Sequence, residues 1–151
     1  MSVGIGYDSH RFAEGRRLIL GGVEIEHARG LAGHSDADVL THAVIDALLG
    51  AAGMGDIGTL FPDDEDRWRD ADSIDLLRTV VGTVSGRIVN VDATLVCEEP
   101  RIGPFRAEME RTLAEATSAR VSVKATTNEG MGWIGRGEGI GCIAVASVDS
   151  E

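Results

Sequence analysis

The chain has 151 residues, of which 43% are apolar and 26% are charged, as is typical of a single globular domain spanning 1–151. The formal net charge of −11 argues against general affinity for nucleic acid or an anionic membrane surface. This net charge does not exclude a phosphate-bearing ligand, because a few local cations or a metal ion can make the electrostatic potential inside one pocket positive.

Hydrophobic periodicity and turn residues predict the elements in chain order. They are a strand at 2–8, two short β runs within 17–25 that meet at Gly21-Gly22, a loop at 29–35, a helix at 36–52, a loop over 55–71, a helix at 72–85, a strand at 88–97, a turn between Pro100 and Pro104, a helix at 105–117, and strands at 120–126 and 139–149. Helices do not alternate strictly with strands. This order favours an α+β fold, a two-layer sandwich of helices on one mixed β-sheet.

The ends of the first helix have recognisable signals. Ser35 is the predicted N-cap, and Asp38 three residues later resembles the partner in a capping box. Gly53 and Gly55 are predicted to end the helix.

The two cysteines, Cys97 and Cys142, lie far apart in apolar, strand-like runs, which favours buried free thiols over a metal motif. No basic-then-apolar leader opens the chain, and no apolar run reaches the length of a membrane span. We therefore expect a reducing, cytoplasmic setting.

Asp8 and His10 stand two residues apart in the first predicted strand. Side chains alternate across a strand, so both point to the same face and can bend onto one ion. The alternative is a polar face on an edge strand.

The first helix supplies a possible third ligand. Asp38, His42 and Asp46 recur at intervals of four residues and share one helix face. A lone histidine there is usually a core residue, but with Asp8 and His10 it completes a set that suits Zn²⁺ with an open fourth position. The same set fits a non-haem iron triad. His34 and Asp38 are candidates for supporting hydrogen bonds or for contact with a substrate.

A second constellation follows the strand at 120–126, where threonines, an acid and several glycines occupy 124–139. Backbone N–H groups and hydroxyls in such a loop can cradle phosphate oxygens. Glu129 could hold Mg²⁺ or Mn²⁺ against a diphosphate. The alternative is an ordinary glycine-rich turn between strands.

Together these stretches resemble the 2-C-methyl-D-erythritol 2,4-cyclodiphosphate synthase family. The resemblance rests on GYDSH at 6–10, GHSDADVLTH at 33–42, GDIGTLFPD at 55–63, KATTNE at 124–129 and GRGEG at 135–139. It implies a homotrimer with active sites between neighbouring subunits. It also implies a lyase of non-mevalonate isoprenoid biosynthesis, in which a 2-phosphate on methylerythritol attacks the β-phosphorus of a cytidine diphosphate group and releases CMP.

The resemblance also implies a role for each matching residue. Asp8, His10 and His42 would bind Zn²⁺, Glu129 and the substrate phosphates would hold Mg²⁺ or Mn²⁺, and His34 and Thr127 would stabilise the transition state. Among the implied substrate-binding residues, Ser35 would lie near the phosphoryl oxygens, Asp56 and Gly58 at a sugar, and Asp63 at the methylerythritol hydroxyls. The residues implied around cytosine are Pro100, Arg101, Ile102, Ala125 and Thr126. Trp133 and Arg136 would lie at a central cavity that in related proteins can hold isoprenoid diphosphates.

The sequence departs from relatives at three of these positions. Asn128 stands where some have a third threonine, Trp133 where some have phenylalanine, and Arg101 where others have lysine. Two rival functions use the same residues: a hydrolase with a zinc-bound water, and a trimeric binding module that senses a diphosphate at Arg136 and uses the metal structurally. A cyclase is the favoured interpretation, because its nucleophile is already a phosphate anion and needs no strong base.

Overall fold

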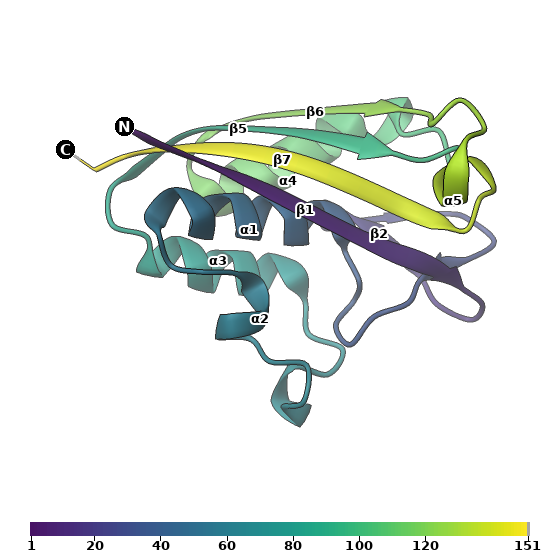
Figure 1. The fold of residues 1–151 in the computed structure, drawn as a ribbon, viewed down its shortest axis with the longest axis horizontal. Coiled ribbons are helices and arrows are strands. Elements are labelled where there is room, and N and C mark those ends of the chain that lie inside the picture. Colours follow the sequence, from purple (N-terminus) through teal and green to yellow (C-terminus); the bar gives the residue numbers. More distant parts are fainter. Residues whose placement is uncertain (151) are drawn as a thin grey trace.

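A five-stranded mixed sheet forms one layer of the protein, and helices cover one of its faces (Figure 1). The computed structural model describes residues 1–150. The strands are β1 (Ser2–Ala13), β2 (Leu18–Leu20), β3 (Val23–Ile25), β4 (Gly30–Leu31), β5 (Arg87–Val96), β6 (Arg120–Thr126) and β7 (Gly139–Asp149). The helices are α1 (Val39–Ala52), α2 (Ile57–Leu60), α3 (Ser73–Thr83), α4 (Arg106–Thr117) and α5 (Gly132–Gly135), with 3₁₀ turns at Asp66–Trp68 and Gly103–Phe105.

The sheet order is β4-β1-β7-β5-β6, and only β5 and β6 run parallel. Strands β2 and β3 form a separate hairpin through Gly21-Gly22. The predicted α+β sandwich on a mixed sheet is confirmed. The short elements β4, α2 and α5 lie in segments predicted as loops. An element of two to four residues is too short to give a periodic signal in the sequence.

Glycines on β1 bring the sheet and helix α1 unusually close. Gly4 and Gly6 face the helix, and a Cβ on either would overlap the backbone of Ala47 or Ala43. Since Val3, Ile5 and Tyr7 alternate with these glycines and are exposed, the first half of β1 has a glycine side against the helix and an apolar outer side. This close approach lets short side chains on the strand reach side chains on the helix.

The predicted N-terminus of the first helix is wrong by three residues. Helix α1 begins at Val39, and its N-cap is Asp38, whose side chain accepts a hydrogen bond from Thr41 N at 3.0 Å. Ser35 is therefore not the cap. Ala37 has φ of 56° and turns the chain just before Asp38. The predicted C-terminus is confirmed, since Gly53 caps the helix with φ of 67°.

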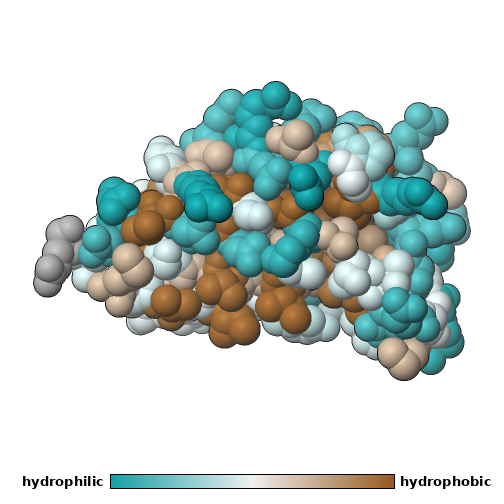
Figure 2. Space-filling model, turned by 90° about the horizontal axis from the view of Figure 1, so that it is seen from above, coloured by the Kyte–Doolittle hydropathy of each residue, from teal (hydrophilic) through white to brown (hydrophobic). Residues whose placement is uncertain are grey.

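Apolar side chains cover the outer face of the sheet. They are Val3, Ile5, Tyr7, Ile143 and Val145, which are 39–70% exposed. Ile5 pairs with Val145 and Tyr7 with Ile143 across β1 and β7, so these residues form one patch. Figure 2 shows hydrophobic side chains gathered along one flank of the molecule. A patch of neighbouring exposed apolar residues on a sheet is typical of an interaction surface.

Both cysteines are buried free thiols, as the sequence predicts. Burial raises the pKa of the Cys97 thiol to about 11, so the thiol stays protonated and unreactive at neutral pH. Within residues 1–150 no helix has the length and apolar character needed to cross a membrane.

Candidate metal centre and surrounding cleft

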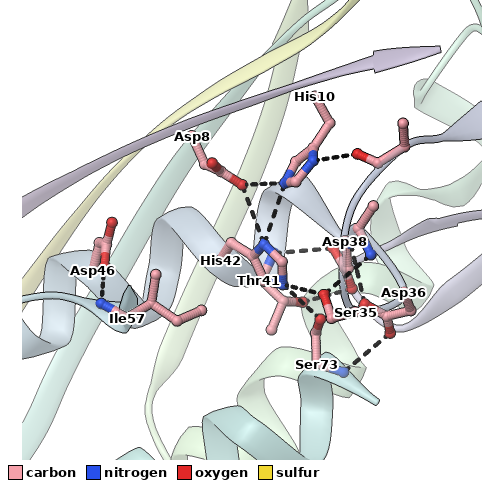
Figure 3. Close-up of polar contacts among 12 residues, drawn as sticks. Asp8, His10, Ser35, Asp36, Asp38, Thr41, His42, Asp46, Ile57 and Ser73 are labelled. Carbon is pink, nitrogen blue, oxygen red and sulfur yellow. Dashed lines mark hydrogen bonds and ion pairs between the residues drawn. The ribbon is translucent and has the colours of Figure 1, made fainter. Parts of the chain in front are cut away.

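Asp8, His10 and His42 converge at the contact between β1 and α1 (Figure 3). Asp8 and His10 extend the helix-facing side of β1 that begins with Gly4 and Gly6, and His42 lies in the first turn of α1. Asp8 Oδ2 is 2.8 Å from His10 Nε2 and 3.2 Å from His42 Nδ1. The two histidine nitrogens are 3.4 Å apart. The predicted juxtaposition of strand and helix residues is therefore present.

This triangle of donor atoms fits a tetrahedral metal ion. Metal–ligand bonds of 2.0–2.2 Å to histidine and carboxylate place neighbouring ligand atoms about 3.3 Å apart around a tetrahedron. The three observed separations, 2.8, 3.2 and 3.4 Å, bracket that value. Two imidazoles and one carboxylate leave a fourth position open. The described residues thus contain a site able to hold a divalent metal.

The electrostatics of the triad favour a bound cation. Burial would raise the pKa of Asp8, but hydrogen bonds from His10 and His42 outweigh it and hold that pKa at about 2. Burial would lower the pKa of His10, yet the hydrogen bond and charge of Asp8 raise it above its ordinary value. Asp8 is therefore a carboxylate at neutral pH, and positive charge beside it is stabilised.

Two backbone features orient the His10 ring. His10 Nδ1 is 2.6 Å from Ala32 O, and because a carbonyl only accepts, Nδ1 carries the proton. In the neutral ring Nε2 is then unprotonated, and it is the ligand atom facing Asp8. A Cβ at Gly33 would lie 3.0 Å from the edge of this ring, so glycine leaves room for it. The segment before α1 thus sets the tautomer of His10.

The metal triad opens onto a cleft that collects further predicted residues. Predicted site residues lining it are Asp8, His10, His34, Ser35, His42, Gly58 and Asp63, and other lining residues are Gly33, Ile57, Phe61, Trp68 and Leu76. Asp56 does not line the cleft. Its exposed side chain caps α2 by accepting hydrogen bonds from Thr59 N and Thr59 Oγ1, both at 2.9 Å.

Asp38 is not a group of this cleft, which corrects the prediction that it supports the ligands directly or contacts substrate. Its side chain is fully buried and points to the hairpin. Its carboxylate accepts hydrogen bonds from Gly21 N and Gly22 N, each at 2.8 Å, and from Thr41 Oγ1 at 2.7 Å. Asp38 lies on the same helix as His42, but it fastens the β2–β3 turn to the start of α1.

Asp46, one turn beyond His42, has a supporting role that the sequence analysis missed. Its carboxylate accepts the backbone N–H of Ile57 at 2.7 Å. It therefore holds the start of α2, and with it Gly58, against α1. The spacing from His42 indicated a shared face, but the sequence contains no signal that pairs Asp46 with Ile57.

The remaining predicted residues, apart from Glu129, lie in two other hollows. Pro100, Arg101, Ile102, Ala125, Thr126 and Thr127 line one together. Trp133 and Arg136 line another with His10, Arg11, Phe12 and Arg29. Glu129 is exposed in the loop after β6, with φ of 53°. It belongs to no ligand cluster of three or more groups among the described residues.

Sheet register separates the metal triad from the hollow around Thr127. Asp8 pairs with Cys142, Cys142 with Leu95, and Leu95 with Ala125, so the four form one row across the sheet. Neighbouring strands lie about 4.8 Å apart, which places Ala125 about 14 Å from Asp8 along this row. A single chain therefore does not bring all the predicted groups together.

Proteins of known identity resemble the chain over its whole length. The YgbB family model matches residues 1–149. A 2-C-methyl-D-erythritol 2,4-cyclodiphosphate synthase of Syntrophomonas wolfei is 52% identical and covers 99% of both chains. One of Salinibacter ruber is 54% identical, again over 99% of both. A solved structure of such a synthase, in a CDP-bound form, has a TM-score of 0.87 at 35% identity, over 97% of this chain and 99% of that chain.

An α+β subunit with an Asp-His-His centre between strand and helix defines a class of metal-binding enzyme. Within that class, the chain belongs to the YgbB family. The relatives carry the synthase name that the sequence motifs suggested, so the predicted family is confirmed.

Proposed function

We propose that the protein is a 2-C-methyl-D-erythritol 2,4-cyclodiphosphate synthase. It converts 4-diphosphocytidyl-2-C-methyl-D-erythritol 2-phosphate to the 2,4-cyclodiphosphate and releases CMP. The observation that carries the proposal is the cleft in which Asp8, His10 and His42 converge beside His34 and Ser35. Phosphoryl transfer needs placement and charge neutralisation more than covalent chemistry, and these side chains supply both.

We assign Zn²⁺ to Asp8, His10 and His42, because the donor types and their tetrahedral spacing suit that ion. When bound, it supplies Lewis acidity at the β-phosphate. Glu129 is assigned to a second cation, Mg²⁺ or Mn²⁺, shared with the substrate phosphates, since carboxylate oxygens are the ligands those ions prefer.

His34, Ser35 and Thr127 are assigned to the phosphoryl oxygens. His34 and Ser35 line the cleft beside the triad. The Thr127 hydroxyl accepts the N–H of Glu129 at 3.2 Å, which leaves its own proton for a phosphate.

The other substrate groups are assigned by the hollow in which each residue lies. Asp63 and Gly58 line the metal cleft, and we assign Asp63 to the methylerythritol hydroxyls and Gly58 to a sugar. Asp56 lies outside the cleft as the N-cap of α2 and is assigned to the same sugar as its neighbour Gly58. The cytosine pocket comprises Pro100, Arg101, Ile102, Ala125 and Thr126. Trp133 and Arg136 are assigned to a diphosphate-binding cavity.

The functional unit is proposed to be a homotrimer in the cytoplasm, with each active site shared between two subunits. Two observations support the shared site. The apolar outer patch of Val3, Ile5, Tyr7, Ile143 and Val145 is exposed in a single chain. The metal triad and Ala125 lie about 14 Å apart in the row across four strands, so a neighbouring subunit is needed to bring a Thr127 loop to each metal centre.

Product analysis tests the reaction. The protein is incubated with the cytidylylated 2-phosphate substrate, zinc and magnesium, and followed by phosphorus NMR. A synthase gives CMP and a cyclic diphosphate in equal amounts. Open-chain phosphates indicate the hydrolase instead, and no turnover with retained binding indicates the binding module. Either of those results contradicts the proposal.

A further inference from the structure

Two residues that carry no role in the proposed reaction, Ser73 and Asp36, form a chain of hydrogen bonds behind His42. His42 presents Nδ1 to Asp8 and His10, so its Nε2 points away from the metal centre (Figure 3). There Nε2 lies 2.8 Å from Ser73 Oγ, at the start of α3. Ser73 is fully buried and His42 is 8% exposed, so water does not substitute freely for this contact.

The direction of these hydrogen bonds follows from the chemistry of Asp36. Ser73 Oγ makes a short hydrogen bond to Asp36 Oδ1, and Ser73 N donates to Asp36 Oδ2 at 3.0 Å. An ionised carboxylate only accepts, so the Ser73 hydroxyl proton points to Asp36. Ser73 Oγ then has only lone pairs to offer His42, and Nε2 must carry a proton. In the neutral ring Nδ1 is then unprotonated, which is the form that binds a metal.

We propose that Asp36 and Ser73 are positioning residues that hold His42 as a Nδ1 metal ligand. Asp36 accepts from Ser73, Ser73 accepts from His42 Nε2–H, and Nδ1 faces the metal. This chain of hydrogen bonds links α3, the segment before α1 and the metal centre, three parts that are distant in sequence. The inference rests on the metal site of the proposed function and deepens it.

The same arrangement prepares Ser35 for substrate. Ser35 Oγ lies 3.1 Å from His42 Nε2 and accepts the N–H of Ala37 at 3.2 Å. The one proton on His42 Nε2 is shared: Ser73 Oγ is the nearer acceptor and Ser35 Oγ the more distant one, so Ser35 accepts both from His42 and from Ala37. Its own hydroxyl proton remains free, and Ser35 lines the cleft. Fixing the His42 tautomer therefore leaves a donor directed to a phosphoryl oxygen.

Zinc affinity, measured by competition with a chromophoric chelator, tests the proposal. Ser73→Ala should weaken zinc binding about 10- to 100-fold, as is usual when the outer partner of a metal-bound histidine is lost. The matched control is Asp72→Ala. Asp72 caps the same helix end by accepting Ile74 N at 2.9 Å but makes no hydrogen bond to His42. The control should bind zinc like the wild type.

A spectroscopic readout separates positioning from general support of the fold. In the zinc-loaded wild type, ¹H–¹⁵N correlation NMR of the histidine rings should show a slowly exchanging proton on Nε2 of His42. This proton should exchange faster and change its chemical shift in Ser73→Ala, where only the longer contact to Ser35 remains, and should be unchanged in Asp72→Ala. If Ser73→Ala does not fold, Asp36→Asn decides, because Ser73 Oγ and Ser73 N donate to different oxygens of Asp36 and an amide replaces one of these oxygens with an NH₂ donor.

The outcomes distinguish this inference from the proposed function. If the wild type binds zinc and folded Ser73→Ala, or Asp36→Asn in its place, binds it equally well, the positioning role is wrong and the metal site stands. Equal losses in Ser73→Ala and Asp72→Ala also overturn it. A wild type that binds no zinc at the triad overturns both.

Discussion

At the scale of single residues, the metal centre is defined by three atoms whose separations match the edges of one tetrahedron. Asp8 Oδ2, His10 Nε2 and His42 Nδ1 lie 2.8 to 3.4 Å from one another. Without a metal ion, protons on His10 and His42 form the hydrogen bonds to Asp8 that keep these three side chains together. Metal and proton therefore compete for the same positions.

Removing one ligand should remove the site while leaving the fold. His42→Ala should weaken zinc binding by more than the roughly 10- to 100-fold that loss of an outer partner costs, because it deletes a ligand atom outright. Competition with a chelator measures the affinity, and circular dichroism checks the fold. His27→Ala, a histidine outside the cleft, serves as control. Full zinc occupancy in His42→Ala would contradict the assignment.

Zinc binding should weaken as the pH falls. The pKa of His10 is raised above its ordinary value by Asp8, against the effect of burial. Below that raised pKa a proton occupies the imidazole, and a metal must displace it. Apparent zinc affinity should therefore be greatest at alkaline pH, fall as the pH drops through the pKa of His10, and be accompanied by proton release. Calorimetry in buffers of different ionisation enthalpy measures the released protons. Their absence at a pH of about 6, below the ordinary pKa of histidine, would contradict this prediction.

The residue scale is also where the sequence was most informative. Alternation along a strand placed Asp8 and His10 on one face, and the structure confirms that placement. The contact with His42 depends on how strand and helix pack; the ligand types suggested it, and the family resemblance implied it. Ser73 was missed because a serine at the start of a helix is ordinary, and nothing in the sequence connects it with His42.

At the scale of elements, helix α1 is held by contacts at both ends and along its length. Asp38 fastens its start to the β2–β3 turn, Asp46 fastens α2 beside it, and the β1 glycines allow close packing. The sequence predicted both helix ends from capping residues. It misplaced the N-terminus because Ser35 and Asp38 are equally good caps locally, and only the distant hairpin donors favour Asp38.

Loss of Asp38 should destabilise the fold strongly. Asp38→Ala removes the acceptor for Gly21 N, Gly22 N and both groups of Thr41, all in or near the core. A buried donor left without an acceptor costs about 1–3 kcal/mol before the structure relaxes. We therefore expect the free energy of unfolding to fall by at least about 3 kcal/mol. Asp72→Ala removes a single N-cap bond and should cost about 1 kcal/mol. Denaturant unfolding at one protein concentration compares the two, and equal losses would show that the hairpin contacts of Asp38 add nothing.

At the scale of the whole molecule, one chain contains two halves of a proposed site on different strands of its sheet. The metal triad begins on β1, and the Thr127 and Glu129 loop follows β6, with β7 and β5 between them. The sequence predicted both halves from their motifs. It contained no direct signal of their separation, because strand order and register arise from pairing between distant segments.

Because of this register, two variants that are each defective in a different half of the proposed active site can be combined in one assembly. If each site takes its metal half from one subunit and its Glu129 half from the next, then His42→Ala and Glu129→Ala, each inactive alone, should complement each other when co-expressed. In a cyclic trimer every mixed assembly regains one intact site of three, so random mixing at equal amounts should restore about a quarter of wild-type turnover. Assemblies purified through two different tags should approach a third. If each site were complete within one chain, every mixture of the two variants would be inactive. The activity of the mixtures therefore tells whether neighbouring subunits share the active site.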